Sequence, residues 1–110
     1  MESKKVPDRD EGGIKTPPSI SQIVDKIYTL ESSNGKHDSC KSIGKFNGYG
    51  FMIHGNTYTC YDSYAEVRGE VEKWFTKHLK DMDLATATCY YNLGVKTNNC
   101  SYHDKFLSLN

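Results

Sequence analysis

Glu31 is the residue of this 110-residue chain whose type and position are best suited to acid–base chemistry. Apolar residues recur at helical spacing from Ile20 to Leu30, and Glu31 extends that stripe. Eleven positions, about three helical turns, separate Ile20 from Glu31, so its carboxyl group is expected on the apolar face near the helix C-terminus. Apolar surroundings and the negative end of the helix dipole would both raise its pKa, as a general acid requires. On position alone, a glutamate that extends into solvent past the last turn is the simpler interpretation.

The four cysteines form an even set in a short chain, which is typical of disulfide-bonded domains. Four cysteines allow three pairings. We favour the pairing that closes two local loops, Cys40–Cys60 and Cys89–Cys100, although the sequence alone does not fix it. A zinc site is disfavoured because the chain has no C-x-x-C pair and its four histidines are scattered. We therefore expect disulfides, no metal and no cofactor.

Charge and hydropathy exclude several classes of function. The formal net charge is zero with both signs mixed along the chain, which argues against a nucleic-acid-binding protein. No apolar run is long enough to cross a membrane, and no signal peptide is recognisable. If the disulfides form, the chain works outside the reducing cytosol. We expect a secreted, periplasmic or cell-wall-associated monomer whose natural precursor carried an export segment.

A capping pattern and a Pro-Pro pair divide the chain into a tail and one folded domain. Residues 1–18 are polar and end in the Pro-Pro pair, which is typical of a disordered tail or linker. The folded domain is expected over residues 19–110. It begins with Ser19-Ile20-Ser21-Gln22, a capping-box pattern that starts the Glu31 helix, and residues 32–35 end that helix.

The rest of the domain is predicted to contain a small β-hairpin and three further helices. The polar segment 36–46 is predicted to be a loop, and the glycines of 47–50 permit a tight turn. Residues 51–54 and 57–61 flank Gly55-Asn56, which indicates a two-residue hairpin turn. The predicted helices are 64–80, which starts with a capping box at Ser63 and Glu66, 84–91, which is capped by Asp83, and 102–109. The predicted fold class is α+β, with helices dominant.

Three short motifs follow one another along the chain. They are Glu31-Ser32-Ser33 at a helix end, Gly50-Phe51-Met52-Ile53, and Tyr91-Asn92-Leu93-Gly94. Their order and spacing resemble the lysozyme-like superfamily, most closely the group of soluble lytic transglycosylases and goose-type lysozymes. That group has a catalytic Glu followed by Ser, then Gly-Leu-Met-Gln, then Tyr-Asn-x-Gly. The resemblance covers about residues 19–107 and differs at Ile53, where the family has a glutamine that contacts the substrate.

The resemblance implies a lysozyme-like domain that cleaves the β-1,4 bond between N-acetylmuramic acid and N-acetylglucosamine in the glycan strands of peptidoglycan. Glu31 would be the general acid and base, and Tyr91 would lie beside it as a second catalytic residue. The implied substrate-binding residues are Ser33, Tyr49, Gly50, Phe51, Met52 and Asn92. The favoured reaction is that of a lytic transglycosylase, in which the sugar's own 6-hydroxyl replaces water and closes a 1,6-anhydro ring. Hydrolysis by a lysozyme of the same fold is the alternative.

A second catalytic carboxyl group is hard to identify from the sequence. Glycosidases usually pair two carboxyl groups, whereas lytic transglycosylases by resemblance need one. Asp38, in the polar loop after Glu31, and Asp62, just before a helix, are the candidates. Capping of the helix explains Asp62 equally well.

Two non-enzymatic interpretations remain open. One is a glycan- or protein-binding module on a lysozyme-like scaffold, because a fold does not determine a function. The other is a disulfide-stabilised extracellular interaction protein with no sugar ligand. The abundant tyrosines fit either an enzyme or a binder, since they can stack on sugars or pack with one face and keep the hydroxyl in water. The tyrosines considered for stacking are Tyr49, Tyr58, Tyr61 and Tyr90.

Overall fold

The computed structural model describes residues 17–53 and 57–109, and this part of the chain is dominated by helices. In chain order the elements are α1 (Ile20–Ser32), the 3-10 helix η1 (Ser39–Ile43), β1 (Met52–Ile53), β2 (Thr57–Tyr58), α2 (Tyr64–His78), α3 (Leu84–Leu93) and α4 (Ser101–Ser108). The helix-dominated fold class with a small β element is therefore confirmed. The predicted tail, 1–18, lies outside the described residues except for its last two positions.

Helix α1 forms where the capping box and the apolar stripe predict it. The Ser19 hydroxyl accepts a hydrogen bond from the Gln22 N–H at 3.1 Å, and the Gln22 side chain accepts one from the Ser19 N–H at 2.8 Å. The stripe turns Ile23, Val24 and Ile27 into the core, where each is at most 1% exposed. The helix ends because Ser33 adopts the left-handed conformation, with φ of 52°.

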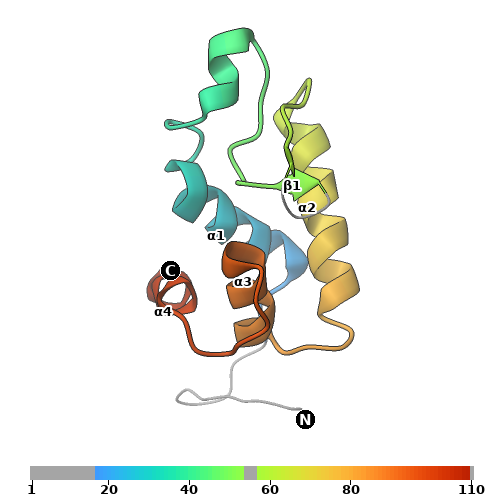
Figure 1. Cartoon of the computed structure of the whole chain (residues 1–110), viewed down its shortest axis with the longest axis vertical. Coiled ribbons are helices and arrows are strands. Elements are labelled where there is room, and N and C mark those ends of the chain that lie inside the picture. Colours follow the sequence, from blue (N-terminus) through green and yellow to red (C-terminus); the bar gives the residue numbers. More distant parts are fainter. Residues whose placement is uncertain (1–16, 54–56, 110) are drawn as a thin grey trace.

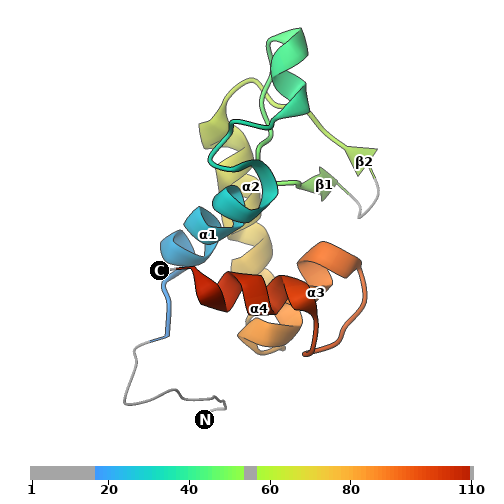
Figure 2. The ribbon, with the colours of Figure 1, turned by 90° about the vertical axis from the view of Figure 1, so that its left-hand side faces the viewer.

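The core lies where the four α-helices meet. Figures 1 and 2 show η1 toward one end of the molecule and α3 and α4 toward the other, with the hairpin between them, level with the middle of α2. Helix α1 packs against α2 and α4, and α3 packs against α4. The buried cluster consists of Ile23, Val24, Ile27, Tyr49, Val67, Val71, Phe75, Ala87 and Phe106. No helix in the described part of the chain is both long enough and apolar enough to span a membrane.

Two disulfides link elements that are close in the chain. Cys40–Cys60 joins η1 to the segment after β2, and Cys89–Cys100 joins α3 to the residue that caps α4. These are the two local loops favoured from the sequence, with separations of 20 and 11 residues. A disulfide that closes a loop of this size reduces the conformational freedom of the unfolded chain and thereby stabilises the fold by about 3 kcal/mol.

The segment after α1 differs from its prediction. Residues 36–46 were expected to be a plain loop, but they contain η1, because the Asp38 side chain caps it by accepting a hydrogen bond from the Cys40 N–H at 3.1 Å. In the hairpin, Met52 pairs with Tyr58 and Ile53 with Thr57 in antiparallel register. The predicted turn at Gly55-Asn56 lies outside the described residues.

Helix α2 begins as predicted, but its capping box is incomplete. The Ser63 hydroxyl accepts a hydrogen bond from the Glu66 N–H at 3.1 Å, whereas the Glu66 carboxylate accepts one from Asp62 N–H at 3.1 Å and none from Ser63. The helix ends at His78, two residues before the predicted end, where Nδ1 of His78 is 2.8 Å from the Trp74 carbonyl oxygen. Asp83 caps α3 through the Thr86 N–H at 2.8 Å, as predicted.

Candidate active site

The Glu31 side chain lies at the C-terminal end of α1 and is half-buried. Its Oε2 accepts a hydrogen bond from the Tyr102 hydroxyl at 2.7 Å. Burial raises the pKa of Glu31 above its ordinary value, and the Tyr102 hydrogen bond opposes part of that rise because it favours the carboxylate. Glu31 therefore combines a pKa shifted toward neutrality with a donor that stabilises the charge left after the proton departs.

Gly50 lies against the other carboxylate oxygen. A Cβ atom at Gly50 would overlap Oε1 of Glu31, so only glycine permits this close approach. Gly50 also has φ of 62°, a left-handed conformation that costs other residues about 1–2 kcal/mol. The Glu31 carboxyl group is thus held between the Tyr102 hydroxyl and the Gly50 backbone.

Asn47 fixes the loop that carries Gly50. Its buried side chain accepts hydrogen bonds from the Tyr49 N–H at 3.0 Å and the Phe51 N–H at 3.1 Å. Its amide group donates to the Phe51 carbonyl at 2.9 Å and to the Thr59 carbonyl at 2.7 Å. With all of these bonds made inside the protein, the loop backbone beside Glu31 is rigidly positioned.

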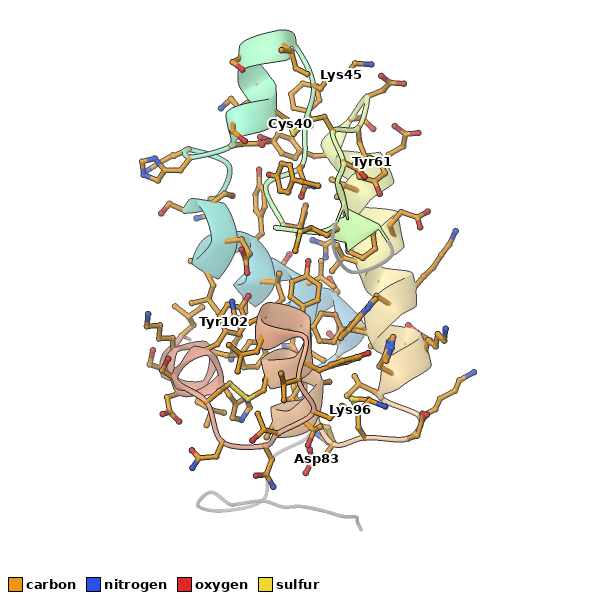
Figure 3. All side chains as sticks on the ribbon, in the orientation of Figure 1. Cys40, Lys45, Tyr61, Asp83, Lys96 and Tyr102 are labelled. Carbon is orange, nitrogen blue, oxygen red and sulfur yellow. A yellow bond between two sulfur atoms is a disulfide. The ribbon has the colours of Figure 1, made fainter. Side chains whose placement is uncertain are left out.

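Tyr102 is the contact of Glu31 that the sequence did not reveal. The sequence predicts only that Tyr102 begins the short helix 102–109, and it gives this tyrosine no role. The Cys89–Cys100 disulfide fixes the start of α4 two residues before Tyr102, and Figure 3 shows Tyr102 between α4 and α1. Burial and the nearby Glu31 carboxylate both raise the pKa of Tyr102, so its hydroxyl stays protonated and available as a donor. In the sequence, the position of Tyr102 two residues after Cys100 is the one signal that could have indicated its role.

Glu31 lines a polar pocket of about 330 Å³, which we call the Glu31 pocket. Its volume is within the range of small-molecule sites, at the lower end. The residues that line it are Glu31, Ser32, His37, Ser39, Gly48, Gly50 and Tyr58.

A second pocket, of about 550 Å³, adjoins the first at Gly50, which lines both. We call it the aromatic pocket because Phe51, Trp74, Tyr90 and Tyr91 line it. Its remaining lining residues are Met52, Lys77, His78, Asn92, Leu93 and Gly94. A polymer that occupied both pockets would pass Gly50 and the Glu31 carboxyl group.

Most of the predicted site residues lie at one of the two pockets. Gly50 lines both, and Phe51, Met52 and Asn92 line the aromatic pocket. Of the tyrosines considered for stacking, Tyr58 lines the Glu31 pocket and Tyr90 the aromatic pocket. The fold therefore places these residues at two pockets that share Gly50.

Tyr91 does not hydrogen-bond to Glu31. Its hydroxyl donates to the Tyr49 carbonyl at 2.5 Å, and its ring stacks on Phe75 with centroids 5.3 Å apart. Burial raises the pKa of Tyr91 well above its ordinary value, and the neighbouring Glu31 carboxylate adds to the rise. Tyr102 therefore holds the position on the carboxyl group that the resemblance suggested for Tyr91, and a catalytic role for Tyr91 stays a prediction.

Two of the predicted substrate-binding residues, Ser33 and Tyr49, line neither pocket. Ser33 is exposed at the C-cap of α1, and Ser32 lines the Glu31 pocket instead. Tyr49 is 3% exposed and its ring stacks on Tyr28 with centroids 4.6 Å apart. The Tyr49 ring is therefore a core element that cannot stack on a sugar.

Neither candidate for a second carboxyl group faces these pockets. Asp38 is 7% exposed and accepts hydrogen bonds from the Cys40 N–H, from the Asn47 N–H at 2.9 Å and from the Tyr64 hydroxyl at 2.9 Å. Asp62 is exposed and pairs with Lys45 at 2.5 Å, and the predicted capping role belongs to Ser63. Among residues 17–53 and 57–109, Glu31 is the one acidic residue that lines either pocket.

Comparison with known proteins does not assign this chain to a family. No protein-family model, no curated protein and no solved structure matches this chain. Within the described residues, no group of three or more possible metal ligands is present. The site is therefore interpreted from its own geometry.

Proposed function

We propose that this chain is a lysozyme-like enzyme that cleaves the β-1,4 bond between N-acetylmuramic acid and N-acetylglucosamine in peptidoglycan. The observation that carries the proposal is the Glu31 carboxyl group, which is half-buried with a raised pKa and lines the Glu31 pocket beside Gly50, the residue that lines both pockets. Such a group can remain protonated where an exposed glutamate would be ionised. Two adjoining pockets offer a path for a polymer rather than a closed cavity for a small molecule.

In the first step Glu31 gives its proton to the leaving oxygen. The Tyr102 hydroxyl engages Oε2, which leaves Oε1, the oxygen beside Gly50, to carry the transferred proton. As the bond between the anomeric carbon and that oxygen breaks, negative charge develops on the carboxyl group. The Tyr102 hydrogen bond strengthens at this moment because its acceptor becomes a full carboxylate.

In the second step the Glu31 carboxylate takes the proton of the muramic acid 6-hydroxyl. The freed oxygen attacks the anomeric carbon and closes a 1,6-anhydro ring, and Glu31 is again protonated for the next cycle. This route needs one carboxyl group and no water, and it fits the finding that Glu31 alone among the described acidic residues lines the pockets. Hydrolysis would need water to attack in place of the 6-hydroxyl.

The location follows from the disulfides and the substrate. Both Cys40–Cys60 and Cys89–Cys100 brace parts of the site, because the first anchors η1 and the second anchors α4 with Tyr102. Disulfides persist in oxidising compartments and are rare in the cytosol. We therefore place the enzyme at the cell wall, where peptidoglycan is its partner.

The test is a digest of purified peptidoglycan with the wild-type protein and with Glu31→Gln, followed by mass spectrometry. We expect muropeptides one water lighter than hydrolysed ones from the wild type, and at least about a hundredfold slower release from Glu31→Gln. Asp62→Asn, which changes an exposed carboxyl group outside both pockets, is the matched control and should act like the wild type. Equal product release by wild type and Glu31→Gln would contradict the proposal. Products that have gained a water molecule would show that the reaction is hydrolysis and not transglycosylation.

A further inference from the structure

Helix α4 carries the hydrogen-bond donor of Glu31 and is short. Tyr102, its second residue, donates to the Glu31 carboxylate, and its buried residues are His103 and Phe106. The segment that leads into α4, 94–99, is mostly exposed. A helix of 8 residues has little stability of its own, so the position of Tyr102 depends on what anchors α4 to the rest of the protein.

The Cys89–Cys100 disulfide is the covalent anchor of α4. It joins the buried Cys89 of α3 to Cys100, the N-cap of α4, two residues before Tyr102. Figure 3 shows this disulfide as a yellow bond between α3 and α4. The bond therefore fixes the start of the helix that places the Tyr102 hydroxyl on Glu31.

The Cys100 sulfur lies where a helix favours negative charge. As the N-cap side chain of α4, it accepts a hydrogen bond from the His103 N–H at 3.4 Å. A thiolate at a helix N-terminus is stabilised by such N–H groups and by the positive end of the helix dipole. Cys100 is also part-exposed, whereas Cys89 is fully buried. The disulfide is therefore more accessible from its Cys100 side, and reduced Cys100 has a stabilising environment.

The Cys40–Cys60 disulfide is held differently. The backbones of Phe46 and Tyr61 pair in an antiparallel bridge through hydrogen bonds of 2.8 and 2.7 Å, and Tyr61 directly follows Cys60. This bridge would keep the two sulfurs of Cys40–Cys60 close together after reduction, which favours re-formation of the bond. In the described structure, segment 94–99 between α3 and α4 makes no such backbone pairing. Once reduced, the two sulfurs of the second disulfide are therefore freer to separate.

We propose that Cys89–Cys100 is a redox switch: an external thiol reduces it in preference to Cys40–Cys60, and its reduction releases α4 so that Tyr102 leaves Glu31. The inference rests on the proposed function, to which it adds regulation. While the disulfide is intact, the Tyr102 donor is in place and the enzyme is active. In a reducing compartment α4 is held by non-covalent packing alone, and the activity falls. Activity is thereby tied to the oxidising compartment in which the enzyme meets peptidoglycan.

The reduction is a thiol–disulfide exchange that consumes two external thiol groups. The thiolate of the first attacks the Cys100 sulfur, the S–S bond of the protein breaks, and Cys89 leaves as a thiolate that takes up a proton. The second attacks the external sulfur of this mixed disulfide and releases Cys100 as a thiolate at the start of α4. The protein disulfide is thus reduced to two cysteines, and the two external thiols are oxidised to one disulfide.

Selective reduction of the folded wild-type protein tests the preference between the two disulfides. The protein is equilibrated in buffers with increasing ratios of reduced to oxidised dithiothreitol, free thiols are alkylated, and peptide mass spectrometry identifies the labelled cysteines. We expect Cys89 and Cys100 to be labelled at a ratio at least about tenfold lower than Cys40 and Cys60 require. Labelling of all four cysteines together, or of Cys40 and Cys60 first, would overturn the inference.

Backbone hydrogen exchange tests the release of α4 in the buffer that reduces only Cys89–Cys100. The amides of α4 should exchange at least about tenfold faster after reduction, whereas those of α1 and α2 should keep their protection. The double variant Cys89→Ser/Cys100→Ser should show the same pattern without reductant. Unchanged protection of α4 in the reduced wild type would overturn the inference. Loss of protection in α1 and α2 would also overturn it, because the disulfide would then support the whole fold.

Peptidoglycan digestion separates this inference from the proposed function. The selectively reduced wild type should digest about tenfold more slowly than the oxidised protein, and Tyr102→Phe, which already lacks the donor, should lose less than about twofold on reduction. Equal digestion by oxidised and reduced wild type would end the regulatory inference and leave the enzymatic proposal standing. No digestion by the oxidised wild type would end the enzymatic proposal, while labelling and hydrogen exchange would still decide whether reduction releases α4.

Discussion

The regions around Glu31 and Asp38 contain two carboxyl groups, one half-buried and one buried, that differ in how many hydrogen bonds they accept. Asp38 accepts three hydrogen bonds, from two backbone N–H groups and the Tyr64 hydroxyl. Glu31 accepts one, from Tyr102, and its other oxygen faces Gly50 at the junction of two pockets. Asp38 is thus a structural anchor for the loop, while one Glu31 oxygen has no protein donor, as the proposed proton transfer requires.

In this comparison, hydrogen bonding rather than residue type separates a structural carboxyl group from the proposed catalytic one. Burial raises the pKa of Glu31 because a single donor does not compensate the lost hydration. A buried carboxylate with three of its about four acceptor positions occupied by protein donors holds its neighbours in place and has little capacity left for a substrate. Substitutions at each carboxyl group and its partners should therefore separate stability from activity.

The largest expected effect on stability is at Asp38. Asp38→Asn replaces one acceptor oxygen by an NH₂ group, which leaves buried donors of Cys40, Asn47 or Tyr64 without a partner. We expect the free energy of unfolding to fall by about 3 kcal/mol, measured by urea denaturation. Glu31→Gln should stay within about 1 kcal/mol of the wild type, since Gln can still accept the Tyr102 hydrogen bond. A Glu31→Gln protein that unfolds more easily than Asp38→Asn would contradict this comparison.

Gly50→Ala should affect both stability and activity. The added Cβ atom meets the Glu31 carboxyl group, and alanine is strained at φ of 62°, at a cost of about 1–2 kcal/mol. Gly44→Ala is a matched control, because Gly44 has φ of 73° but nothing within 4 Å of an added Cβ. Both variants should lose similar stability from strain, and only Gly50→Ala should also lose at least about tenfold in peptidoglycan digestion. Equal activity of the two would show that Gly50 does not position Glu31.

Tyr102→Phe should have a smaller effect on the rate and a specific effect on its pH dependence. Loss of the donor removes the one hydrogen bond that holds the Glu31 pKa down, so the pKa of Glu31 should rise further. The high-pH limb of the rate profile for peptidoglycan digestion should move to higher pH. The rate at the optimum pH should be about tenfold lower than that of the wild type. Tyr61→Phe is the control, because the buried Tyr61 hydroxyl has no hydrogen-bond partner in the described structure. A pH profile of Tyr102→Phe that coincides with that of Tyr61→Phe would exclude a positioning role.

The smallest effect is the pH dependence of stability. The pKa of Glu31 is raised in the folded protein, so the folded state binds this proton more tightly than the unfolded state does. The contribution of Glu31 to the free energy of unfolding should be fully present at pH below 4.5, the ordinary pKa of a glutamate. It should be lost as the pH rises from 4.5 through the raised pKa of the folded protein. Urea denaturation of wild type and Glu31→Gln across this range should show that loss in the wild type alone. An identical slope in both proteins would mean that Glu31 does not titrate as the structure requires.

Local patterns in the sequence predicted the part of the site that depends on local structure. The capping box at Ser19 and the apolar stripe are contained within one helix, and they placed Glu31 at the end of α1 in register with the stripe, although position alone favoured a solvent-exposed side chain. The disulfide pairing favoured from short separations along the chain, which the sequence alone left open, is the pairing that the structure has. These features need no knowledge of how distant elements pack.

The missed features depend on side-chain direction or on long-range packing. Tyr49 and Gly50 are neighbours in sequence, but the Tyr49 ring turns into the core while Gly50 lies at the pockets. The contact between Glu31 and Tyr102 joins residues 71 positions apart and depends on where α4 packs. Periodicity and motifs within one segment carry no information about such a contact.

The most direct test of the central claim is a titration of the Glu31 side-chain carboxyl group by NMR in the folded wild-type protein. Assignment of its carbon resonance comes from comparison with Glu31→Gln. The structure predicts a midpoint clearly above the ordinary value of 4.5, which moves higher in Tyr102→Phe. A midpoint at or below 4.5 would show that this carboxyl group is well hydrated and ionised, and an acid-catalytic role for Glu31 would be excluded.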